Sequence, residues 1–206
     1  WNPSLEDIES KITDKTKAIV VINPNNPTGA VFSKETLEGI VDIARRHSLL
    51  IFADEIYDLI LYTEAPHYNL ATLAPDLLVF TFNGLSKSYR ACGYRAGWVV
   101  ITGPKDHARD FLAGFHLMAS MRLCSNVPAQ YAIVAALEGE QDIQIQTAPG
   151  GRLHEQWKTT VDTLDTIPGV SVVVPKGSMY AFPRFDPEVY PIADDEKFSM
   201  SLVENE

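Results

Sequence analysis

The chain has 206 residues, of which 46% are hydrophobic and 21% are charged, and its formal net charge at pH 7 is −10. Such a balance is ordinary for a globular protein, and the acidic charge argues against a nucleic-acid partner, because phosphate contacts need clustered lysine and arginine. No run of about 18 apolar residues is available to cross a membrane. Two cysteines are too few for a disulfide framework, so we expect reduced thiols and a cytoplasmic location.

Three continuous apolar runs in the first half of the sequence predict strands: Ala18 to Ile22, Leu49 to Ala53, and Leu77 to Phe82. Continuous rather than alternating runs favour strands buried on both faces, as in a parallel sheet covered by helices. An amphipathic helix is predicted between the first two strands, with Ser33 as its N-cap. Its apolar positions recur at helical spacing: Leu37, Ile40, Val41 and Ala44.

A fourth apolar run, from Gly97 to Ile101, follows the third strand too closely for a parallel crossover. It is therefore expected to pair antiparallel with its neighbour. Helices are predicted from about Lys105 to Met118 and from about Pro128 to Leu137. Asn126 is expected to cap the second of these helices, with a proline in the first turn.

The sequence Pro149-Gly150-Gly151 breaks the helical pattern and marks the predicted domain boundary. A further helix is expected around Trp157, followed by a hairpin made of Val170 to Val174 and Met179 to Phe185. We therefore predict an α/β fold, a three-layer α/β/α large domain with a mostly parallel sheet over 1–149, incomplete in this chain. Residues 150–206 are expected to form a linker helix and the start of a small α+β domain.

Polar side chains follow each of the three predicted parallel strands. Asn23–Gly29 follows the first strand, Asp54–Tyr57 the second, and Asn83–Lys87 the third. Ligands of open α/β sheets bind outside the carboxyl ends of the strands. An amide, a carboxylate with a phenol, and an amine are thus predicted to meet at one edge of the sheet.

Asp54 ends an apolar run, so its carboxylate is expected to need a cationic partner. A protonated pyridine nitrogen is one such partner, and a positively charged ring of this kind can absorb the carbanion formed at a substrate α-carbon. The alternative is structural, because Asp54 could equally cap a helix or pair with an arginine.

Lys87 follows a glycine-containing loop after a strand, where an amine can act as a nucleophile. The alternative for any single lysine is a surface position. Arg95 stands between Gly93 and Gly97, and its planar guanidinium with glycine on either side is suited to a phosphate.

These residues together resemble the fold-type I, class I/II aminotransferases that depend on pyridoxal 5'-phosphate (PLP). The shared motifs are N-P-x-N-P-T-G over 23–29, D-E-x-Y over 54–57, S-K at 86–87 and G-x-R-x-G over 93–97. The resemblance implies that Lys87 is the catalytic lysine, which forms a Schiff base with PLP and moves the substrate's proton. It implies that PLP is bound by six residues: Asn26, Asp54, Tyr57, Ser86, Lys87 and Arg95. Asn26 would also help to bind the substrate carboxylate.

Three further segments resemble the bacterial glutamate–pyruvate (alanine) branch of this family: Phe82–Lys87, Ala119–Cys124 and Asn126–Gln130. The implied reaction is amino-group transfer between L-alanine and 2-oxoglutarate, with amino acids and 2-oxo acids as partners. The implied full-length form is a homodimer without nucleic-acid or membrane partners. The alternatives are an aminotransferase with another substrate range, a PLP-dependent lyase, and the PLP-binding effector domain of a transcription regulator.

The sequence begins without methionine and stops within a predicted helix, so we expect an internal fragment of a longer enzyme. An N-terminal phosphate-binding stretch and the arginine that binds the substrate carboxylate would then lie outside it. On this basis the 206-residue chain alone is expected to be inactive or nearly so with L-alanine and 2-oxoglutarate.

Overall fold

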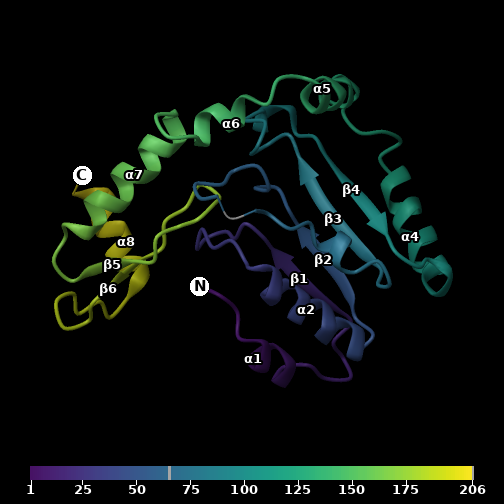
Figure 1. Ribbon diagram of the computed structural model, residues 1–206, viewed down its shortest axis with the longest axis horizontal. Coiled ribbons are helices and arrows are strands. Elements are labelled where there is room, and N and C mark those ends of the chain that lie inside the picture. Colours follow the sequence, from purple (N-terminus) through teal and green to yellow (C-terminus); the bar gives the residue numbers. More distant parts are fainter. Residues whose placement is uncertain (65, 206) are drawn as a thin grey trace.

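The computed structural model describes residues 1–64 and 66–205, and a four-stranded sheet lies at its centre (Figure 1). The strands are β1 (Ala18–Ile22), β2 (Leu50–Asp54), β3 (Val79–Gly84) and β4 (Gly97–Thr102), in the order β1-β2-β3-β4. The first three are parallel, and β4 is antiparallel to β3. The predicted mostly parallel α/β sheet and its antiparallel edge are confirmed.

Three strands, β2, β3 and β4, end later than the apolar runs indicated, because their last residues still pair with neighbours although they are not hydrophobic. Asp54 is the last residue of β2, where it lies opposite Ile22 of β1 and Phe82 of β3. Similarly, β3 continues to Gly84, which lies opposite Gly97. Backbone pairing is indifferent to side-chain polarity, and a hydrophobic pattern therefore misses such residues.

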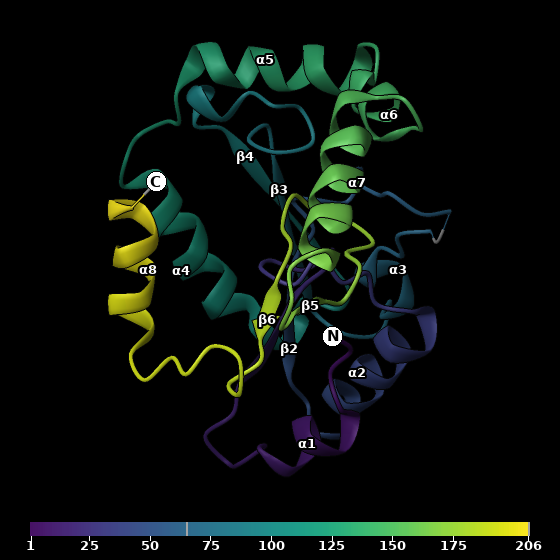
Figure 2. The ribbon, with the colours of Figure 1, turned by 90° about the vertical axis from the view of Figure 1, so that its left-hand side faces the viewer.

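One face of the sheet is covered by α2 (Lys34–Arg46), with α1 (Leu5–Ser10) and α3 (Leu70–Leu73) packed beside it (Figure 2). The predicted N-cap is confirmed, since the Ser33 hydroxyl accepts a hydrogen bond of 3.2 Å from the Thr36 backbone N–H. The apolar side of α2 is buried against β1, β2 and β3, and this layer is the main hydrophobic core.

The opposite face carries α4 (Arg109–Ser120), which follows a short 3-10 turn, η2 (Asp106–Ala108). Phe111 and Phe115 of α4 pack on Phe80, each with ring centroids 5.8 Å apart. The prediction of strands buried on both faces is wrong for β1, where Val20 is 67% exposed. The contacts of α4 are with the centre of the sheet, at β3, and not with β1 at its edge.

A 3-10 turn, η1 (Cys92–Tyr94), lies in the connection between β3 and β4. After α4, two helices lead to the C-terminal part: α5 (Val127–Glu138) and α6 (Asp142–Thr147). The predicted cap of α5 is confirmed, because the Asn126 side chain accepts from the Ala129 N–H. No helix among the described residues combines the length and hydropathy needed to cross a membrane.

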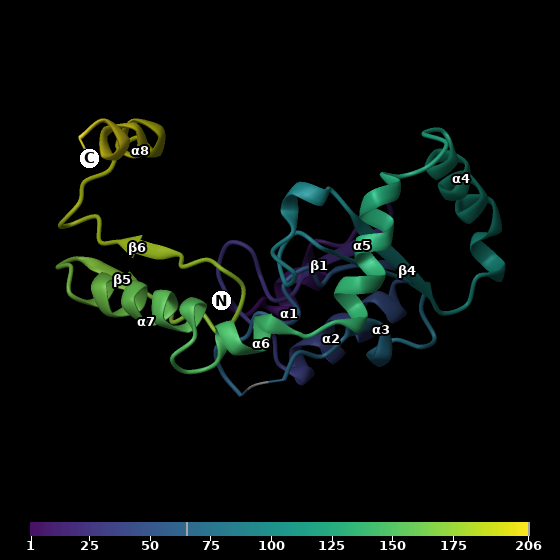
Figure 3. The ribbon, with the colours of Figure 1, turned by 90° about the horizontal axis from the view of Figure 1, so that it is seen from above.

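The C-terminal part consists of α7 (Arg152–Asp165), β5 (Val170–Val172), β6 (Pro183–Phe185) and α8 (Asp195–Glu204), set beside the sheet (Figure 3). The predicted antiparallel hairpin is confirmed in the pairing of β5 with β6, but both strands are shorter than predicted. The intervening residues 173–182, called here the bridging loop, instead bond to the first part of the chain. The N–H groups of Lys176 and Gly177 donate to the Gly29 carbonyl over 2.8 and 3.0 Å.

Candidate active site

The carboxyl ends of β1, β2 and β3 bring the three predicted polar segments to one edge of the sheet. The first segment is folded on itself, with the Asn25 N–H donating to the Ala30 carbonyl over 2.8 Å. The bridging loop holds the same segment from outside, because the Ser178 hydroxyl donates to the Asn25 carbonyl over 3.1 Å. The loop that carries Asn26 is therefore fixed by contacts from both parts of the chain.

Tyr57 lies at the centre of this edge and is only 3% exposed. Its phenol oxygen is 2.6 Å from that of Tyr180 in the bridging loop, and the two rings meet edge to face with centroids 5.6 Å apart. The Lys87 amine nitrogen lies 5.7 Å from the centroid of the Tyr57 ring. An amine and two phenols thus share one small region.

Asp54 and Asn26 act on the same phenol. Burial raises the pKa of Tyr57 well above its usual range, and the Tyr180 phenol and the Asp54 carboxylate add to this rise. A hydrogen bond from Asn26 lowers the pKa of Tyr57 and opposes the rise. Tyr57 therefore keeps its proton at neutral pH and can act as a hydrogen-bond donor. The Asp54 carboxylate is itself oriented by the Ile56 N–H, which donates to Oδ1 over 3.2 Å.

Ser86, which directly precedes Lys87, forms a second pair of donors with Arg95. The Arg95 guanidinium donates to the Ser86 hydroxyl over 3.4 Å and to the Cys92 carbonyl over 2.8 Å. Arg95 is exposed, whereas Ser86 and Lys87 are half-buried. A guanidinium with a neighbouring hydroxyl is a typical arrangement for binding a phosphate.

Sequence reasoning missed Tyr180, which reaches the site from 123 residues further along the chain than Tyr57. No local pattern marks this tyrosine, because the two residues are joined only by the docking of the bridging loop. That docking includes an isolated β-bridge between Leu61 and Gly177.

Sequence reasoning also missed a polar cluster beneath the edge, which is formed around Glu55 and His67. Glu55 is 4% exposed and accepts hydrogen bonds from the Asn69 amide (2.5 Å) and the Leu70 N–H (2.9 Å). His67 lies between Glu55 and Asn23, with Nε2 3.4 Å from the Glu55 carboxylate and Nδ1 3.4 Å from the Asn23 amide nitrogen. A donating amide leaves Nδ1 as acceptor, so Nε2 carries the ring hydrogen. Among the described residues this N–H has no acceptor in hydrogen-bonding geometry, although the Glu55 carboxylate lies 3.4 Å away.

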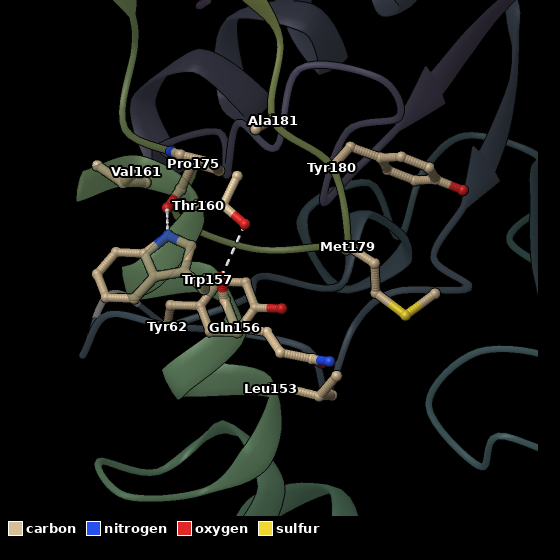
Figure 4. Close-up of a pocket in the computed structure, with 10 residues that line it drawn as sticks. All are labelled: Tyr62, Leu153, Gln156, Trp157, Thr160, Val161, Pro175, Met179, Tyr180 and Ala181. Atoms are coloured by element: carbon tan, nitrogen blue, oxygen red, sulfur yellow. Dashed lines mark hydrogen bonds between the residues drawn. The ribbon is translucent and has the colours of Figure 1, made fainter. Parts of the chain in front are cut away.

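A cavity of about 130 Å³ lies next to the site, between α7 and the bridging loop (Figure 4). Its walls include Tyr62, which stacks on Trp157 with centroids 5.4 Å apart, and Tyr180. The Trp157 indole N–H donates to the Pro175 carbonyl over 2.9 Å, and this bond fastens the bridging loop to α7. None of the six residues expected to bind PLP lines this cavity.

The half-buried phenol of Tyr62 gives a testable dependence of stability on pH. Burial raises the pKa of Tyr62 to about 12, above the value of about 10 for a free tyrosine. The folded protein thus holds this proton more tightly than the unfolded chain does. The contribution is fully present below about pH 10 and is lost as the pH rises toward the folded-state value.

We therefore expect the free energy of unfolding of the wild-type protein to fall relative to that of Tyr62→Phe between about pH 9 and pH 11.5. Denaturant unfolding of both proteins across this range measures the difference. Tyr131→Phe is the control, because Tyr131 is 77% exposed. A constant difference between wild type and Tyr62→Phe would contradict the expectation.

The donor set at the edge of the sheet fits PLP on chemical grounds. A pyridine nitrogen needs a carboxylate, a phenolic oxygen needs hydrogen-bond donors, a phosphate needs a cation with neighbouring donors, and an aldehyde needs an amine. The chain supplies each of these groups: the carboxylate is that of Asp54, and the donors to the phenolic oxygen are Tyr57 and Asn26. The cation with its neighbouring donor is Arg95 with Ser86, and the amine is that of Lys87. Tyr57 lies near three of the others, since Asp54, Asn26 and Lys87 all act on its phenol or its ring.

A parallel sheet with an amine, a carboxylate and a phenol at one edge is the site of a PLP-binding α/β protein, and comparison with known sequences identifies the family. Residues 1–206 match the family described as Aminotransferase class I and II, and the chain belongs to this family. It is similar to the alanine aminotransferase of Mycobacterium tuberculosis, with 60% identity over 206 residues, which are 100% of this chain and 48% of the relative.

Two relatives from Escherichia coli are similar to a comparable degree. Glutamate-pyruvate aminotransferase AlaA is 56% identical over 203 residues, covering 98% of this chain and 50% of that protein. The crystal structure of an aminotransferase from the same organism superposes with a TM-score of 0.94 at 57% identity, covering 96% of this chain and 49% of that one. The chain thus spans about half the length of the relatives that it matches.

Proposed function

We propose that this chain carries the cofactor-binding centre of a PLP-dependent aminotransferase that moves an amino group between L-alanine and 2-oxoglutarate. The observation that carries the proposal is the convergence on Tyr57 of Lys87, Asp54 and Asn26, which come from the ends of three neighbouring parallel strands. The printed names of the relatives at 56% and 60% identity favour alanine and glutamate–pyruvate exchange over other amino donors.

When bound, PLP supplies a ring that takes up the negative charge left on the substrate α-carbon. The Asp54 carboxylate holds the ring nitrogen in its positive form. The Tyr57 phenol, kept protonated by burial, donates together with the Asn26 amide to the phenolic oxygen of the cofactor. The Arg95 guanidinium and the Ser86 hydroxyl hold the phosphate, which fixes the position of the ring.

Lys87 has two roles in this proposal. Its amine would hold the cofactor, and the free amine would carry the proton to and from the α-carbon of the substrate. Its half-buried position above the Tyr57 ring limits contact with bulk water, which would otherwise compete for that proton. Asn26 is exposed and stands where it can also contact the carboxylate of an incoming amino acid.

The wider organisation of the enzyme follows from the same proposal. Residues 1–149 would be part of the large PLP-binding domain, and 150–206 the linker helix with part of the small domain. We expect a cytoplasmic homodimer that takes small amino acids and 2-oxo acids as substrates, and light scattering of the native protein tests the oligomeric state.

The test of function is to incubate the purified full-length protein with PLP, L-alanine and 2-oxoglutarate and to measure both pyruvate and glutamate. Equal amounts of the two products are expected, with L-aspartate a much poorer donor than L-alanine. The visible absorption of bound PLP provides a second measurement that does not depend on turnover. A protein with neither a cofactor band nor products would overturn the proposal, whereas a preference for L-aspartate would overturn only the choice of substrate.

A further inference from the structure

Asp58 directly follows Tyr57 in the sequence, and its carboxylate is used by none of the roles proposed above. Three hydrogen bonds converge on this half-buried side chain. The Leu59 N–H (2.9 Å) and the Ser88 hydroxyl (3.1 Å) donate to Oδ1, and the Asn83 amide (2.8 Å) donates to Oδ2. Two of these three donors belong to the segment that carries Lys87.

Asn83 and Ser88 stand on either side of Lys87, and the side chain of Asn83 is fixed by two hydrogen bonds. Asn83 lies in β3, and while its amide N–H donates to Asp58, its side-chain oxygen accepts from the Gly84 N–H over 2.7 Å. Ser88 is the residue after Lys87 and is 2% exposed. The Asp58 carboxylate therefore clamps both ends of the turn from which the amine projects.

The charge of Asp58 matters for the bond to Ser88. The single hydroxyl proton of Ser88 can reach either the Ile56 carbonyl at 3.3 Å or the carboxylate at 3.1 Å. A charged acceptor forms the stronger hydrogen bond, so the carboxylate takes this proton. A neutral amide at position 58 would lose this advantage, and it would present N–H groups to donors that need an acceptor.

We propose that Asp58 is a positioning residue, whose carboxylate holds Asn83 and Ser88 and thereby fixes the direction of the Lys87 amine. The proposal rests on the proposed function, because it assigns Asp58 a role through the lysine that attaches PLP. Asp58 touches no reacting atom. Its effect is on how often Lys87 points at the cofactor, and a displacement of about 1 Å at a reacting group can lower a rate about 100-fold.

The experiment compares the purified full-length wild-type protein with its Asp58→Asn variant. PLP is added to the apo form, samples are reduced with borohydride at intervals, and mass spectrometry measures the cofactor fixed on Lys87. We expect Asp58→Asn to slow this labelling and to lower kcat, each by about 10- to 100-fold, with a much smaller change in KM. Ser88→Ala, which keeps the carboxylate, should slow labelling in the same direction but less.

Glu55→Gln is the matched control, because it also removes a carboxylate that accepts hydrogen bonds inside the fold, but one that contacts the Asn69 amide, the Leu70 N–H and His67. It should lower the thermal unfolding midpoint of the apo protein about as much as Asp58→Asn does, without slowing the labelling of Lys87. Adding Ser88→Ala to Asp58→Asn should have little further effect, since both changes break the same contact.

Labelling of Asp58→Asn at the wild-type rate would overturn the positioning role. The positioning role would also be overturned if Glu55→Gln slowed the labelling of Lys87 as much as Asp58→Asn does, because Asp58 would then have only a structural role. If Asp58→Asn does not fold, a wild-type rate in Ser88→Ala overturns the role instead. Failure of the proposed function has a different result, namely a wild-type protein in which Lys87 takes up no cofactor.

Discussion

Replacing Lys87 with alanine is expected to abolish covalent attachment of PLP and to lower turnover by about 10⁴-fold. Proton transfer by a positioned side chain contributes up to about 10⁴-fold to a rate, and here the same amine is also the nucleophile. The loss should appear in kcat more than in KM, because the other contacts to PLP and substrate do not involve the amine.

The measurements are steady-state kinetics with L-alanine and 2-oxoglutarate and mass spectrometry after borohydride reduction of the holoenzyme. Lys105→Ala is the control, since Lys105 is exposed at the turn before α4. A label on a lysine other than 87, or normal turnover of Lys87→Ala, would refute the assignment of the catalytic lysine. Thermal unfolding of the apo variant should stay close to wild type, because the side chain is only half-buried.

Replacing Asp54 with asparagine is expected to lower kcat by about 10²- to 10³-fold, the usual effect of losing one preorganised electrostatic contact in an active site. The amide has the size of the carboxylate and can still accept from the Ile56 N–H, so the loop after β2 should keep its shape. What it loses is the negative charge that holds the ring nitrogen of PLP protonated.

Asp54→Glu separates charge from position, and it should recover part of the rate if the charge is the decisive property. Asp14→Asn is the control for a general change in net charge, because Asp14 is exposed between α1 and β1. Cofactor retained after dialysis provides a readout apart from turnover, and it should fall in Asp54→Asn. Full activity in Asp54→Asn would show that this carboxylate has a structural role instead.

The bridging loop gives the site a feature that the individual motifs do not contain. Its Tyr180 contacts the Tyr57 phenol, and its backbone is bonded to Gly29 and to Ile60, on two different segments of the edge. The C-terminal part of the chain therefore contributes to the environment of the cofactor residues, although none of the six predicted cofactor residues lies in it.

Local sequence patterns are enough to predict the main helices and strands and the residues at this edge of the sheet. Apolar runs placed all four strands of the main sheet, and Ser33 and Asn126 marked the beginnings of α2 and α5. The antiparallel direction of β4 followed from the length of its connection to β3. These features are encoded within about 15 neighbouring residues, where periodicity, capping and loop length act directly.

Tertiary structure alone decided which distant residues meet. Three of these contacts join residues that are 12 to 123 positions apart in the sequence. They are the contact of Tyr57 with Tyr180, that of His67 with Glu55, and the hydrogen bond from Ser88 to Asp58. The segment between β5 and β6 does not close on itself as a hairpin turn, because the N–H groups of Lys176 and Gly177 donate to the distant Gly29 carbonyl. A buried polar group must find a partner somewhere in the fold, but the sequence pattern around it does not say where.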